Sequence, residues 1–152
     1  MKTYNEIEAE NQEELASRAW FHLMRAHRYL YPRFERSLRD YGIDNPVWYE
    51  IMLEIERAGE QGAKAADLQD KLYMAQFTMS RHISRMEKKG LVERQPDKED
   101  GRAHLIFLTK KGADVNKELW PHYFRTIQKE VGAHLNKDEA FTLFKLLTKI
   151  YS

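Results

Sequence analysis

The sequence predicts a mainly α-helical (α+β) fold in which a single β-hairpin interrupts a series of helices. Apolar residues recur at three- and four-residue steps through most of the chain, which is typical of amphipathic helices. The segment after Gly90 differs, because two runs rich in Val, Ile, Leu and Phe flank a loop of proline, glycine and charged residues. With 152 residues, 42% of them hydrophobic, the chain is long enough for one domain with its own core.

Composition excludes several classes of protein. The chain has no cysteine, which rules out a disulfide framework, a cysteine-based metal site and a cysteine nucleophile. No apolar run approaches the ~20 residues of a membrane helix, and the acidic start MKTYNEIEAENQEE lacks the features of a signal peptide. We therefore expect a cytoplasmic protein without a membrane partner.

The first part of the chain predicts two helices. A long amphipathic helix spans about Glu13–Tyr41, and Pro32 inside it should cause a kink or a break. Gly42 should end this helix. The next helix opens at Asp44-Asn45-Pro46, where a polar side chain that can cap the helix precedes proline.

Two short helices in close succession follow. Leu68 and Leu72 indicate a helix of about two turns, and a short connection leads to a second helix with Met79, Ile83 and Met86 on one face. The runs LVERQ and HLIFLT then predict a hairpin whose long tip is PDKEDGRA. This order of elements is typical of a helix-turn-helix followed by a wing.

Two further helices complete the chain. Thr109 can cap the first of them, in which Pro121 predicts a second kink, and Asn136 can cap the last. The whole order predicts a winged helix-turn-helix with N- and C-terminal dimerisation helices. Their apolar faces are larger than one small domain can cover, which indicates a homodimer. The candidate interface residues are apolar: Leu15, Trp20, Leu23, Phe141, Phe144, Leu147 and Ile150.

The predicted organisation has three parts. Residues 1–42 form an N-terminal tail and dimerisation helix, residues 43–110 the winged helix-turn-helix, and residues 111–152 the C-terminal dimerisation helices. Within the middle part, the second helix of the helix-turn-helix covers about 75–89 and the wing about 91–109.

Positive charge is concentrated in this middle part. The formal net charge is only +1, yet residues 76–111 hold nine basic and five acidic residues. Because salt screens charges beyond ~8 Å, a local cluster matters more to a polyanion than the balanced total. A solvated helix face has the same composition, so charge alone leaves both interpretations open.

The second helix of a helix-turn-helix lies in the major groove, where exposed polar and basic side chains contact base edges. With Met79, Ile83 and Met86 facing inward, the residues left for the groove are polar, basic or aromatic: Gln76, Phe77, Thr78, Ser80, Arg81, Ser84 and Arg85. Arginine can form two hydrogen bonds with guanine, and glutamine with adenine. An ordinary amphipathic surface helix is the alternative.

The hairpin tip carries two cations, Lys98 and Arg102, that can reach phosphates or enter a narrow minor groove. Three acidic residues in the same tip argue against general phosphate binding. We expect Asp100 to pair with an arginine, either Arg102 or Arg94, and to fix its guanidinium group.

The stretch from Ser80 to Gly112, SRHISRMEKKGLVERQPDKEDGRAHLIFLTKKG, resembles the MarR family of bacterial winged-helix regulators. The similar features are the recognition helix, EKKGLVER, the wing motif Asp100-x-Arg102 and the later pair Leu108-Thr109. The resemblance implies a transcriptional repressor that binds double-stranded DNA at a pseudo-palindromic operator, with Arg102 of each subunit in a minor groove. Ala75 and Phe77 depart from the family pattern, which affects the expected operator sequence.

The resemblance also implies a small aromatic or anionic effector, bound between the DNA-binding lobe and the dimerisation helices. Aromatic and histidine side chains on the first two helices are the candidates for this pocket: Trp20, Phe21, His27, Trp48 and Tyr49. Their helical spacing favours an alternative in which they pack in the core or the dimer interface.

Two other function classes are less well supported. The six histidines lack the spacings of a metal-binding helix, and no nucleophile has a positioned base, so we expect neither an enzyme nor a metal or other cofactor. A winged-helix module that binds protein and not DNA is the remaining alternative. The basic residues Arg81, Arg85 and Arg102 argue against it.

Overall fold

A computed structural model describes the whole chain, residues 1–152. Its elements, in chain order, are α1 (Tyr4–Glu8), α2 (Gln12–Leu38), α3 (Val47–Ala58), β1 (Ala63–Lys64), α4 (Ala65–Leu72), α5 (Gln76–Lys88), β2 (Val92–Pro96), β3 (His104–Leu108), α6 (Lys110–Glu130) and α7 (Lys137–Tyr151). Short 3₁₀ turns follow α2, α3 and α6. The predicted mainly α-helical class with one hairpin is confirmed.

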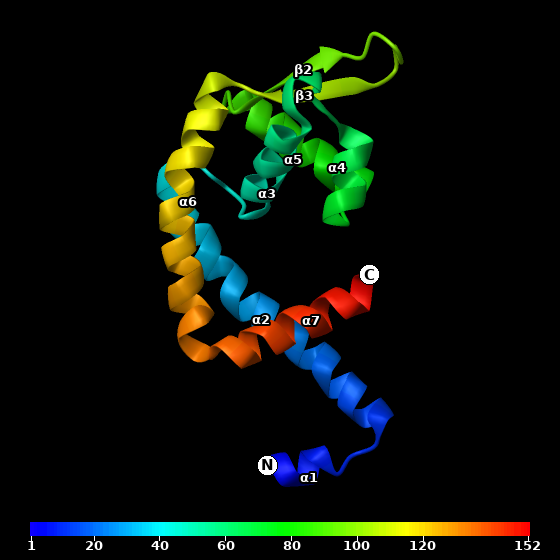
Figure 1. Ribbon diagram of the computed structural model, residues 1–152, viewed down its shortest axis with the longest axis vertical. Coiled ribbons are helices and arrows are strands. Elements are labelled where there is room, and N and C mark those ends of the chain that lie inside the picture. The colour runs from blue at the N-terminus through cyan, green and yellow to red at the C-terminus, as the bar shows by residue number, and fades with distance from the viewer.

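The elements divide into a compact lobe and a set of extended helices. Figure 1 shows α3, α4, α5 and the β2–β3 hairpin gathered at one end, while α2 and α6 lead away from them toward the two termini. The antiparallel sheet has the order β1-β3-β2, with Ala63 opposite Ile106 and Val92 opposite Leu108. This arrangement is a winged helix-turn-helix flanked by terminal helices.

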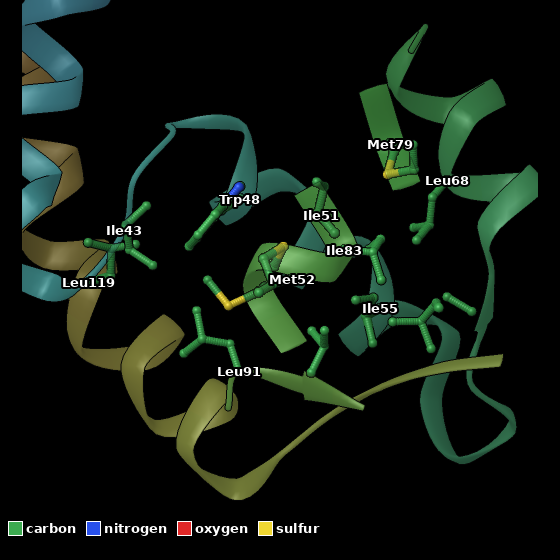
Figure 2. Close-up of a cluster of buried hydrophobic side chains, with 14 of the residues drawn as sticks. Ile43, Trp48, Ile51, Met52, Ile55, Leu68, Met79, Ile83, Leu91 and Leu119 are labelled. Carbon is green, nitrogen blue, oxygen red and sulfur yellow. The ribbon is translucent and has the colours of Figure 1, made fainter. Parts of the chain in front are cut away.

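The hydrophobic core lies almost entirely in this lobe. Figure 2 shows side chains of α3, α4 and α5 meeting above the sheet, with Trp48, Ile51 and Met79 among them. Leu38 of α2 and Leu119 of α6 close the edge of the core, since both are fully buried. The lobe also contacts the helices farther along their length, since Tyr49 of α3 packs against Tyr123 of α6 and the Tyr73 hydroxyl donates to the Tyr151 carbonyl.

Most helix ends follow the sequence signals. The Thr109 hydroxyl accepts a hydrogen bond from Gly112 N at 2.9 Å, and Asn136 forms a reciprocal capping box with Glu139. At α3 the N-cap position is occupied by Pro46, and the side chain of Asn45 before it accepts from Val47 N at 3.0 Å. Gly42 ends the α2 segment with a φ of 75°.

A break at Pro32, one of the two outcomes expected there, does not occur, and the kinks expected at Pro32 and Pro121 stay predictions. Neither Pro32 nor Pro121 ends its helix, because α2 and α6 continue through both positions. A proline removes one intrahelical hydrogen bond, but a long helix that packs against a neighbouring helix can continue through it. The sequence pattern also missed α1 and the two-residue strand β1, which are too short to show a period.

The terminal helices leave much apolar surface uncovered in one copy of the chain. Helix α7 contributes no buried residue, and α2 contributes only Leu38. The exposed large side chains here include Trp20, Phe21, Phe141, Phe144 and Ile150, the last of which is 75% exposed. No helix is both long and apolar enough to cross a membrane.

Candidate nucleic-acid interface

Helix α5 presents a polar face because its apolar face is fully used by the core. Met79, Ile83 and Met86 are at most 1% exposed. The opposite side of the helix carries exposed residues: Gln76, Phe77, Thr78, Ser80, Arg81 and Arg85. The Arg81 guanidinium lies 5.6 Å from the Phe77 ring centroid, one helical turn away. The face thus combines hydrogen-bond donors with an exposed aromatic ring.

The start of α5 lacks a side-chain cap. Ala75 occupies the N-cap position and makes no side-chain hydrogen bond, and the first turn holds no acidic residue. Free amide groups and the helix dipole at such an end favour a negative group. Because Ala75 carries no hydroxyl, only backbone amides are available as donors at this end of the helix.

The wing is a hairpin whose tip spans residues 97–103. Asp97 is buried at its base, where its side chain accepts from Glu99 N at 3.0 Å and its backbone amide donates to Ala103 O. Lys98 and Arg102 are exposed and form no ion pair within 4.0 Å. Both cations are therefore free to contact an anion.

The expected pairing of Asp100 with an arginine side chain is wrong. Its carboxylate instead accepts from the backbone amide of Arg102 at 3.1 Å. A short aspartate side chain reaches the amide two residues ahead more readily than a distant guanidinium. Asp100 thus shapes the turn from which Arg102 projects.

Arg94 links the wing to α5. Its guanidinium donates to the Ser84 hydroxyl at 3.2 Å and to the Ser80 carbonyl at 3.4 Å, and it lies 3.7 Å from Glu87. These partners recur at three- and four-residue steps on one face of α5. Ser84 is half-buried there. Its hydroxyl is therefore used in holding the wing, whereas we expected it to face the groove of DNA.

Helix α5 and the wing line an open groove of about 660 Å³. Gln76 and Ser80 of α5 line it together with Arg94, Asp100 and Arg102 of the wing. Lys64 of β1 also lines it, although the sequence analysis did not select this residue. The structure therefore brings the second helix and the wing to a common surface.

Trp48 connects this face to the core. Its indole Nε1 donates to His82 Nδ1 at 3.0 Å, and Trp48 is fully buried. Burial, followed by repulsion from Arg85 and Arg81, lowers the pKa of His82. The lowered pKa favours the neutral imidazole, whose Nδ1 accepts the hydrogen bond from the indole and so links α5 to α3.

Comparison with known proteins identifies the domain that carries this surface. The sequence model of the MarR family matches residues 45–104, which span α3 to the start of β3. The chain carries a MarR-family domain.

Curated relatives of this chain are bacterial transcription regulators. The chain is 29% identical over 140 residues to the transcriptional activatory protein BadR of Rhodopseudomonas palustris, covering 91% of this chain and 80% of BadR. It is 30% identical over 105 residues to the organic hydroperoxide resistance transcriptional regulator of Bacillus subtilis, covering 66% of this chain and 65% of that protein.

Solved MarR-family structures share the fold over most of the chain. The MarR-family regulator Sco3205 of Streptomyces coelicolor, solved in complex with DNA, has a TM-score of 0.80 at 21% identity and covers 93% of this chain and 90% of its own. MepR of S. aureus, also solved with DNA, has a TM-score of 0.73 at 20% identity, covering 87% and 94%.

A second cavity, of about 510 Å³, lies between the MarR-family domain and the long helices. Its lining comes from α2, α3, α5 and α6 and includes His27, Tyr31, Phe34, Thr78, His82 and Tyr123. Burial raises the pKa of Tyr31, and burial followed by the nearby Glu50 raises the pKa of Tyr123 to about 12. Both phenols therefore keep their protons at neutral pH.

The five residues expected to line an effector pocket do not meet in one site. Only His27 lines this cavity, since Trp48 is in the core and Tyr49 lines a different hollow with Trp120. Trp20 and Phe21 are exposed two turns before His27, which is about 10 Å along the helix axis. Neighbouring helical residues point ~100° apart, so Trp48 and Tyr49 cannot face one cavity.

The cavity residues that sequence reasoning missed are Tyr31, Phe34, His82 and Tyr123. A signal existed for the first two, because they lie four and seven residues after His27 on one helix face. No local pattern places Tyr123 of α6 beside them. No group of three or more His, Cys, Asp or Glu residues is placed to hold a metal ion.

Proposed function

We propose that this chain is a sequence-specific regulator of transcription that binds double-stranded DNA as a homodimer. The observation that carries the proposal is the shared groove in which Gln76 and Ser80 of α5 face Arg94 and Arg102 of the wing. Relatives named as transcription regulators, and fold neighbours solved with DNA, support it. The proposed action is binding without catalysis, in the cytoplasm.

Helix α5 is proposed to enter the major groove with its exposed face. In this proposal the exposed Arg81 and Arg85, four residues apart, form paired hydrogen bonds with guanine, and Gln76 forms them with adenine. Phe77 and Thr78 offer apolar contact to a thymine methyl group. The uncapped amides before Gln76 meet a phosphate and set the depth of the helix.

The wing is proposed to contact the adjacent minor groove. Arg102 projects from a turn shaped by its own backbone bond to Asp100, and no carboxylate neutralises its guanidinium. A narrow minor groove has an enhanced negative potential that attracts an arginine. Lys98 is placed to contact the phosphates at its edge.

A homodimer is proposed to form through the apolar faces of α2 and α7. A stable soluble monomer rarely exposes this many contiguous aromatic and aliphatic side chains. Two copies related by a two-fold axis would place their α5 helices about 34 Å apart, in successive major grooves. The operator should therefore be a pseudo-palindrome.

Repression with effector release is the proposed mode of control. A dimer on a promoter excludes polymerase, and a ligand that prefers another separation of the lobes releases DNA by its differential affinity. The cavity beside Tyr31 and Tyr123 joins the long helices to α5, so an occupant there would alter that separation. Its neutral donors and aromatic walls suit a small aromatic ligand.

Replacing Arg102 with alanine should weaken operator binding by about 1–3 kcal/mol, because the wing loses its contact with the minor groove. Fold and dimer should be unchanged, since the side chain is exposed and unpaired. Fluorescence anisotropy with labelled operator at fixed salt measures the effect. Arg39→Ala, an exposed arginine that does not line the groove, is the matched control. Equal affinities for the two variants would contradict the role of Arg102.

A further inference from the structure

A further cavity, distinct from the groove of the wing and from the aromatic cavity beside Tyr123, lies between α2 and α6. Its volume is about 620 Å³, and none of its lining residues is hydrophobic. The lining consists of charged and hydrogen-bonding side chains: Arg33, Arg36, Ser37, His122, Arg125, Thr126, Lys129 and Glu130. A lining without hydrophobic residues distinguishes this cavity from the aromatic one beside Tyr123.

Positive charge in this cavity is largely uncompensated. Four cations face a single carboxylate, Glu130, which lies 3.6 Å from Arg33. Arg33 also donates to the Tyr29 carbonyl at 2.8 Å, so its hydrogen bonds are partly used. Arg36, Arg125 and Lys129 form no ion pair within 4.0 Å anywhere in the chain. Three cations thus share one cavity without a partner.

A hydrogen-bonded network forms the floor and joins the two helices. A carbonyl oxygen only accepts, so His122 Nε2 donates to the Ser37 carbonyl at 2.7 Å. The Thr126 hydroxyl donates to the His122 carbonyl, which leaves the Ser37 hydroxyl to donate to Thr126 Oγ1 at 2.6 Å. The hydroxyl and imidazole donors of Ser37, Thr126 and His122 are therefore all used within the network. A ligand of this cavity must therefore be held by the cations above the floor.

We propose that this cavity binds a small anion with at least two negative charges, of the class of phosphate esters and polycarboxylates. Its volume falls within the range of about 300–1,000 Å³ that small-molecule sites occupy. Guanidinium groups from two helices, Arg36 of α2 and Arg125 of α6, can each form paired hydrogen bonds with phosphate or carboxylate oxygens. A bound anion would bridge the helices at the junction that the Ser37 network already defines.

Isothermal titration of the full chain with pyrophosphate and with citrate, in low salt and without DNA, tests the proposal. Arg36→Gln and Arg125→Gln should each weaken binding by about tenfold or more, since each removes one charge-assisted contact. Glu130→Gln should strengthen binding, because it removes the only carboxylate of the cavity. Arg39→Gln, an exposed neighbour on the same chain segment outside the lining, should have no effect. Whichever probe binds more tightly distinguishes phosphate from carboxylate ligands.

Three outcomes would overturn the proposal. Binding that is lost in Arg81→Gln and Arg102→Gln but kept in Arg36→Gln would place the anion on the proposed DNA-binding surface. Weaker binding in Glu130→Gln would contradict the electrostatic argument. Failure of both probes to bind would overturn the proposal by itself, and dissociation of the dimer in Arg125→Gln would then assign the cavity to an acidic segment of a second copy. None of these readouts depends on operator binding, so failure here is separable from failure of the proposed function.

Discussion

Replacing Gly112 with alanine should lower the free energy of unfolding by about 3 kcal/mol or more. A Cβ atom at this position would lie 2.0 Å from the Leu91 carbonyl oxygen, and this neighbour is backbone that cannot turn away. The clash falls where the Leu91 carbonyl accepts from Thr109 N and where the Thr109 hydroxyl begins α6. Helix α6 must therefore shift away from the lobe, which breaks this junction.

Urea denaturation followed by circular dichroism measures this effect. Gly101→Ala in the wing tip is the matched control, because a Cβ there meets nothing within 4 Å and the backbone angle is not left-handed. The control should retain the parental midpoint. A Gly112 variant as stable as the Gly101 variant would show that α6 is not held against Leu91 as described.

Replacing both Phe141 and Phe144 with glutamate should abolish the dimer and, with it, tight operator binding. Both rings are more than half exposed in one copy, and their side chains lie 6.5 Å apart between ring centroids on α7. Burying each ring contributes about 1.5–3 kcal/mol, and a two-fold dimer buries the pair twice. The expected loss of about 6 kcal/mol or more corresponds to a dimer dissociation constant that is higher by roughly 10⁴-fold.

Sedimentation equilibrium at micromolar concentration measures the oligomeric state of this double variant. Thr142→Glu, on the polar side of the same helix, is the control and should remain a dimer with parental DNA affinity. A double variant that still sediments as a dimer would contradict the proposal that α7 forms part of the interface. If the parental protein sediments with the mass of one chain, 18.1 kDa, the proposal of a dimer is wrong.

Periodicity and local chemistry predicted the lobe well. Met79, Ile83 and Met86 recur at helical steps because one face of α5 must be buried, and all three are in the core. Thr109 and Asn136 cap the helices that they precede, since capping depends only on residues within one turn. The turn-forming loop between two β-rich runs likewise predicted the hairpin.

Contacts between distant segments could not be predicted in this way. The partner of Arg94 is Ser84, on another element, and this contact depends on how the wing packs against α5. The cavity beside Tyr31 requires Tyr123, which is far away in the sequence. The basic cavity between α2 and α6 arises only when Arg36 and Arg125 are brought together by helix packing.

Selection of bound sequences from a random pool of DNA duplexes tests the central claim most directly, because it reports DNA binding, dimer symmetry and spacing together. The proposed function predicts an enriched pseudo-palindrome whose half-sites are centred about one helical turn, roughly 10 base pairs, apart. Arg81→Ala should change the base preferred within each half-site while keeping that spacing. A pool without enrichment, or one enriched in a single unpaired half-site, would contradict the proposal that two α5 helices recognise one operator.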